Sequence, residues 1–239
     1  MEREQWVGQL DRDLRSGGFP ERAERERAYL KSRLEHYGTP VPGVRAAVKA
    51  FRRRMPQLAG SDVTSLAAAL WAVPVHERRL AAVELLVAYL PMLDPGDIEL
   101  VERLVREAHT WALVDPLAGD VAGPLVERFP DLGAVLDRWV TDGDFWIRRS
   151  ALLALLRPLR AGGGDFERFG RYADRLLGEQ EFFIRKAIGW VLRDTAKRRP
   201  DLVYEWILPR AARASGVTIR EAIKPLSPDQ RAAVLAARG

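Results

Sequence analysis

The chain has 239 residues, enough to bury a sizeable core. It has no cysteine, which excludes disulfides, thiolate nucleophiles and zinc–thiolate sites. Its net charge of +5 is unevenly distributed, because residues 1–143 hold 19 basic and 22 acidic residues whereas residues 144–239 hold 19 and 11. We therefore expect a polyanion to bind the C-terminal part.

The N-terminal residues Met1-Glu-Arg-Glu-Gln5 are charged, and the chain has no run of 18 apolar residues. We therefore expect no secretion signal and no membrane span, and a cytoplasmic location. The three histidines, His36, His76 and His109, lie too far apart in sequence to show a metal-ligand spacing. A surface or packing role is favoured for them, and neither a metal nor another cofactor is expected.

Helical periodicity recurs along the chain between short Pro, Gly and Asp breaks, and no stretch alternates as a strand would. A Ser-Asp pair at 61–62 is expected to cap one of these helices. The expected helices include residues 2–16, 21–37, 44–55, 61–71, 75–90, 94–109, one beginning near 144, and 181–199, with later breaks at Pro200, Pro209 and Pro225.

The spacing of the breaks predicts helix pairs that recur every 35–45 residues, as in degenerate HEAT-like repeats. The predicted fold is all-α, an α-solenoid of antiparallel helix pairs in one domain, 1–239, with a curved, concave surface. An ordinary helical bundle is the alternative.

The helix over residues 181–199 has a broad apolar arc and a cationic edge. Trp190, Lys186, Arg193 and Lys197 fall within about 60° at one side of that arc, with Asp194 as the only nearby acid. This edge is either a solvated face or a surface that stacks on and attracts anions. The arc consists of Phe183, Ile184, Ala187, Ile188, Val191, Leu192 and Thr195.

Two further clusters combine aromatic and charged residues. Trp111 and Asp115 are four apart and share a face if one helix spans both, but Pro116 favours the alternative that Asp115 caps a helix beginning there. In the second cluster Asp144 is an expected N-cap, and Trp146 and Arg149 lie three apart on one face. That pair is either an aromatic and a guanidinium acting together or the start of a helix with a surface cation.

No familiar catalytic motif competes with these clusters. The glycines at 162–164 lack the Lys of a phosphate loop, and no Gly-x-Ser-x-Gly elbow occurs. One carboxylate, several aromatic residues and several cations remain as candidates.

The sequence resembles the AlkD-type DNA alkylation repair glycosylases, a family of HEAT-like repeat proteins. The resemblance is carried by Glu181-Phe-Phe-Ile-Arg-Lys-Ala-Ile-Gly-Trp-Val-Leu-Arg193, by Trp111 and Asp115, and by Phe145-Trp-Ile-Arg-Arg-Ser-Ala151. Further matches are Ala28-Tyr29-Leu30-Lys31, Leu70-Trp71-Ala-Val-Pro74 and Arg220-Glu-Ala-Ile-Lys224.

The resemblance implies a glycosylase, which we expect to be monofunctional and to act as a monomer. It would hydrolyse the N-glycosidic bond of N3- or N7-alkylated purines, such as 3-methyladenine and 7-methylguanine, in double-stranded DNA, without base flipping. It also implies Asp115, Trp111 and Trp190 as catalytic residues, and Arg149 and Tyr29 at the DNA surface. The cationic edge adds Lys186, Arg193 and Lys197 as DNA-binding candidates.

Two other classes stay open. A non-catalytic HEAT-like module for damaged or branched DNA would use the same basic surface but has no use for a carboxylate at Asp115. A protein-binding scaffold would not require cations clustered beside Trp190 and Arg149.

Overall fold

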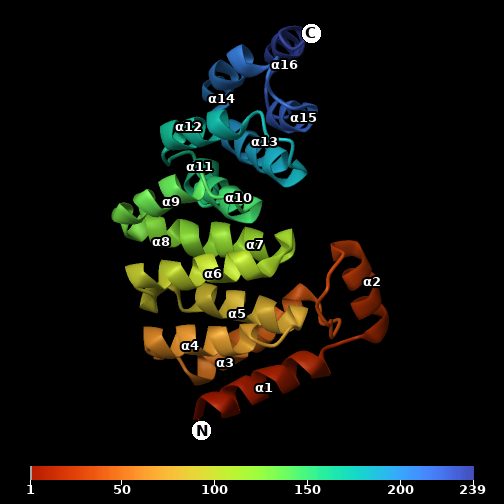
Figure 1. Ribbon diagram of the computed structural model, residues 1–239, viewed down its shortest axis with the longest axis vertical. Coiled ribbons are helices and arrows are strands. Elements are labelled where there is room, and N and C mark those ends of the chain that lie inside the picture. The colour runs from red at the N-terminus through yellow and green to blue at the C-terminus, as the bar shows by residue number, and fades with distance from the viewer. Residues whose placement is uncertain (1) are drawn as a thin grey trace. The chain divides into compact units, whose positions relative to one another are not determined.

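The structure is a computed structural model that describes residues 2–239 (Figure 1). This part of the chain is all-α and contains no strand; an isolated parallel bridge joins Glu35 to Val75. It forms two compact units, the first ending at Leu117 and the second covering Ala118–Gly239. No helix in the described residues combines the length and hydropathy needed to cross a bilayer. The expectation of one repeat domain over 1–239 remains a prediction.

In the first unit, α3 to α7 lie in successive layers, and α2 lies to one side of them (Figure 1). Helix α1 packs on α3 and α4, and α5 contacts α3, α4 and α7. The elements are α1 (Glu2–Ser16), α2 (Pro20–Leu30), α3 (Val41–Arg54), α4 (Gly60–Trp71), α5 (His76–Ala88), η1 (Leu90–Met92), η2 (Pro95–Asp97), α6 (Ile98–Ala108) and α7 (Trp111–Pro116).

The apolar positions repeat every three or four residues, so that each helix buries one face. In α3, for example, Val44, Val48 and Phe51 are buried, while Arg52 and Arg53 are exposed. The core of this unit includes Leu10, Leu14, Val63, Leu66, Leu70, Val83, Leu86, Val101, Leu104 and Val105.

Helix α2 is shorter than the sequence predicts. The helix expected to reach Tyr37 ends at Leu30, because Lys31 adopts the left-handed conformation with φ of 48° and its N–H bonds back to the Ala28 carbonyl. The chain then runs without a helix until Val41, and the Glu35–Val75 bridge lies within this connection. Helix α2 contains no buried residue, so apolar packing does little to hold it.

The second unit is organised around α13 (Phe182–Ala196), which packs against α10, α11, α14 and α15. The elements preceding it are η3 (Leu117–Ala122, beginning at the last residue of the first unit), α8 (Gly123–Arg128), η4 (Pro130–Leu132), α9 (Gly133–Trp139), α10 (Phe145–Leu153), α11 (Leu156–Arg160) and α12 (Phe166–Leu176). Those following it are α14 (Pro200–Ile207), η5 (Leu208–Arg210), α15 (Gly216–Ala222) and α16 (Pro228–Ala236).

The apolar arc predicted for α13 is confirmed. Ile184, Ala187, Ile188, Val191, Leu192 and Thr195 are buried, and Phe183 is half-buried.

Helices α13 and α15 approach closely at Gly189. A Cβ at this position would lie 2.8 Å from the Glu221 Cβ and 3.2 Å from the Thr218 Cα and carbonyl oxygen. Because these atoms belong to the backbone or are bonded directly to it, a side-chain rotation cannot make room for a Cβ. One of the two helices would have to shift. The glycine therefore brings the side chain of Glu221 against α13.

Gly189→Ala is expected to destabilise the second unit by about 1–3 kcal/mol through overpacking. Helix propensity alone predicts the opposite sign, a gain of about 1 kcal/mol. The free energy of unfolding should be measured in denaturant, with Gly178→Ala as the control because a Cβ there meets nothing within 4 Å. A Gly189→Ala protein as stable as the wild type would contradict the close approach.

Candidate functional site

Asp115 lies within α7. Helix α7 begins at Trp111, where the N-cap residue Thr110 accepts a 3.4 Å hydrogen bond from the N–H of Ala112. Asp115 is therefore one turn after Trp111 on the same helical face. The alternative that Asp115 caps a helix starting at Pro116 is wrong, because that helix has already begun.

Pro116 is the last residue of α7, and the helical path continues beyond it. Proline has no N–H to donate, but the helical hydrogen bonding resumes at the next residue, where the N–H of Leu117 donates to the carbonyls of Leu113 and Val114. The π-helical segment η3 follows directly. A wider turn of this kind accommodates the missing bond and is frequent at functional sites.

An exposed aromatic pair accompanies Asp115. Tyr29 of α2 is 74% exposed and Trp111 of α7 is 36% exposed. Their ring centroids are 6.2 Å apart at an interplanar angle of 90°, an edge-to-face contact. The first unit thus presents two aromatic rings together with a half-buried carboxylate one turn away.

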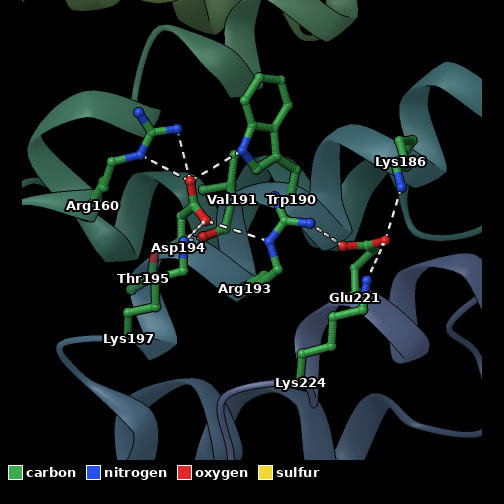
Figure 2. Close-up of polar contacts among 10 residues, drawn as sticks. All are labelled: Arg160, Lys186, Trp190, Val191, Arg193, Asp194, Thr195, Lys197, Glu221 and Lys224. Carbon is green, nitrogen blue, oxygen red and sulfur yellow. Dashed lines mark hydrogen bonds and ion pairs between the residues drawn. The ribbon is translucent and has the colours of Figure 1, made fainter.

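In the second unit, the orientation of Trp190 is set by Asp194. The indole Nε1–H donates to Asp194 Oδ2 over 3.0 Å, and the same carboxylate accepts from Arg160 Nε at 2.8 Å and Lys197 Nζ at 2.7 Å (Figure 2). Asp194 is only 2% exposed. Burial opposes its ionisation, but the hydrogen bonds from Lys197 and Arg160 outweigh burial and lower its pKa.

Glu221 forms a second anionic centre, from α15 (Figure 2). Its carboxylate accepts from Lys186 Nζ at 2.8 Å and Lys224 Nζ at 2.9 Å, and it also pairs with Arg193. Burial again opposes ionisation, but the hydrogen bonds from Lys186 and Lys224, with the charge of Arg193, lower the pKa of Glu221 to about 2.

The cationic edge of α13 is therefore largely neutralised within the protein. The prediction that Asp194 is the only acid near this edge is wrong, because Glu221 also faces Lys186 and Arg193. Glu221 belongs to the segment Arg220-Glu-Ala-Ile-Lys224, which the sequence analysis singled out without assigning it a role. Arg160 also donates to Asp194, and nothing in the sequence pointed to this contact.

Arg149 lies on α10 and is 3% exposed. Its Nη1 donates to the Phe183 carbonyl at 2.5 Å, and its guanidinium lies 5.8 Å from the centroid of the Phe183 ring. The predicted N-cap is confirmed, since the Asp144 carboxylate accepts from the N–H of Trp146. Arg148 points elsewhere, as expected, and pairs with Glu179 at 2.7 Å.

The candidate residues thus form separate groups. Tyr29, Trp111 and Asp115 belong to the first unit, whereas Arg149 and the Trp190 network belong to the second. None of them is part of the only group among the described residues whose ligand atoms are spaced for a metal ion, which is Glu26, His36 and Glu77.

The helices and these side chains define a helical-repeat protein with an all-α fold. Residues 10–226 match the family described as DNA alkylation repair enzyme, and the chain belongs to this family. No curated protein matched the chain.

Solved structures show the same fold. A predicted DNA alkylation repair enzyme from Enterococcus faecalis is 23% identical, with a TM-score of 0.79, over 88% of this chain and 97% of that one. AlkD2 from Streptococcus mutans is 18% identical, with a TM-score of 0.66, over 94% and 99%.

Stability should depend on pH through Glu221. Its folded pKa of about 2 lies below the usual 4.5, so its contribution is present above pH 4.5 and is lost as pH falls toward 2. Glu221→Gln should show a shallower loss of unfolding free energy over this range. Denaturant unfolding monitored by circular dichroism at several pH values would measure it.

Glu205→Gln, at an exposed position of α14, is the matched control and should retain the wild-type slope. Equal slopes for Glu221→Gln and the wild type would show that Glu221 is not held by its cations.

Proposed function

We propose that this protein is a monofunctional DNA glycosylase that hydrolyses the N-glycosidic bond of N3- or N7-alkylated purines in duplex DNA. One observation carries the proposal: Asp115 shares a helical turn with the exposed Trp111 in a chain of the DNA alkylation repair family. We further propose that it acts as a monomer and leaves the lesion stacked in the duplex, as its resemblance to the AlkD-type glycosylases implies.

The chemistry suits a single carboxylate. An N3- or N7-alkylated purine is cationic and leaves readily, so little general-acid assistance is needed. As the bond breaks, the deoxyribose acquires oxocarbenium character, and a nearby anion stabilises that charge. We assign this role to Asp115, which would also position the attacking water.

Aromatic faces complement the same positive charge. Trp111 and Trp190 are assigned to contact the cationic sugar and base through their electron-rich rings, and Tyr29 to contact DNA beside Trp111. The hydrogen bond from Trp190 to Asp194 supports this assignment, because a fixed indole loses little freedom on binding.

Phosphate contacts are assigned to Lys186, Arg193, Lys197 and Arg149. The side chain of Lys197 is 56% exposed, and its ammonium can donate to a phosphate while keeping its bond to Asp194. Arg149 is far more buried, so we assign it a smaller share of the salt dependence.

Asp115→Asn is expected to reduce single-turnover release of 7-methylguanine from duplex DNA by at least about 100-fold, in line with the loss of one electrostatic stabiliser. Affinity for the duplex should stay similar or rise, because a negative charge near phosphates is removed. Release should be followed chromatographically and affinity by fluorescence anisotropy.

Asp120→Asn, at an exposed position in the following η3 segment, serves as the control and should keep full activity. Unchanged excision by Asp115→Asn together with weakened binding would contradict the catalytic assignment. A wild type that binds DNA but releases no base would favour the non-catalytic module for damaged or branched DNA.

DNA affinity should fall steeply with salt, and Lys197→Ala should reduce the slope of log K against log [salt] by about 1. The same change at Lys49, an exposed lysine of α3 in the first unit, is the control and should leave the slope unchanged. A wild-type affinity independent of salt would exclude phosphate contacts by this edge.

A further inference from the structure

The first unit contains a cluster of metal-ligating side chains that the proposed reaction does not use. Glu26 comes from α2, His36 from the connection to α3, and Glu77 from the first turn of α5. One ligand atom of each lies within 4.8 Å of the other two. The cluster therefore joins segments that are far apart in sequence.

Several polar atoms of this cluster are buried without a hydrogen-bond partner. They are both ring nitrogens of His36 and Oε2 of Glu26. Buried polar atoms nearly always have a partner, and those without one commonly mark an ion or an ordered water. Unlike a cluster of exposed acids, this cluster therefore contains buried atoms that can ligate a metal ion and that make no hydrogen bond within the protein.

The two carboxylates, Glu26 and Glu77, can still accept further bonds from a cation. Glu77 Oε1 accepts from the N–H groups of Gly38 and Thr39, but Oε2 accepts only from Tyr37, at 2.9 Å. The other oxygen of Glu26, Oε1, accepts from Arg22 at 3.3 Å. Each carboxylate therefore retains a lone pair for a metal ion.

The charges also favour a divalent ion. A carboxylate oxygen of Glu26 and one of Glu77 lie within 4.8 Å of each other, and two like charges this close repel. A cation between the carboxylates would relieve their repulsion.

His76 supports the cluster from behind. Its ring stacks on that of His36 with centroids 4.7 Å apart and an interplanar angle of 6°. This stack restricts the orientation of the His36 ring.

We propose that Glu26, His36 and Glu77 bind one divalent transition-metal ion, with Zn²⁺ as the best match to one imidazole and two carboxylates and water completing the coordination. The ion would fasten α2, which has no buried residue of its own, to α5. Because α2 carries Tyr29, it would also hold the contact between Tyr29 and Trp111. The site itself does not depend on the proposed function.

The test uses the full chain, stripped with EDTA and dialysed against Zn²⁺ or Co²⁺. We expect one Zn²⁺ per chain by elemental analysis, a higher Tm with Zn²⁺, and visible d–d absorption with Co²⁺. Glu26→Gln and His36→Gln should each weaken Zn²⁺ binding at least 10-fold. Glu26→Gln is the safer variant for folding, because it lies on a helix without buried residues.

His109→Asn is the matched control. It changes the remaining histidine, which is exposed and left-handed at the end of α6, a conformation that Asn tolerates. This variant should bind Zn²⁺ as the wild type does. A stripped wild type that takes up no Zn²⁺, or Zn²⁺ binding that survives both Glu26→Gln and His36→Gln, would overturn the proposal.

Discussion

The second unit depends on two buried or nearly buried carboxylates, Asp194 and Glu221, each surrounded by cations (Figure 2). Removing an ionised carboxylate from water is costly unless charged hydrogen bonds replace its hydration. Four side chains, Trp190, Arg160, Lys197 and Arg193, donate to Asp194, and three cations surround Glu221. Loss of either acid would remove a carboxylate that fixes these cations beside α13, the helix around which the unit is organised.

This arrangement changes how the basic edge of α13 should be understood. Lys186, Arg193 and Lys197 do not form a free positive patch, because internal acids already fix their positions. In the proposed function a phosphate would share these cations with the acids. The gain is preorganisation: the side chains lose less conformational entropy on binding, and Trp190 keeps a fixed orientation.

Much of the fold follows from local patterns. The apolar arc of α13 and the N-cap at Asp144 were predictable because they depend on residues within one or two turns. The cap expected at Ser61-Asp62 was wrong, since α4 already begins at Gly60 with no side-chain cap.

Other features depend on contacts distant in sequence. Helix α2 ends because Lys31 adopts the left-handed conformation, which the neighbouring residues in the sequence do not predict. Glu221 reaches Lys186 only because Gly189 lets α15 approach α13. Pro116 favoured the prediction that a helix starts after Asp115, but the wider π-helical turn of η3 accommodates the proline without a break at Asp115.

The most direct test of the central claim is product analysis of the wild-type protein in single turnover on duplex DNA that contains 7-methylguanine. We expect free 7-methylguanine and an abasic site that is cleaved only by added alkali, because a carboxylate-assisted hydrolysis leaves the strand intact. DNA binding without release of a base, or strand cleavage by the protein itself, would contradict it.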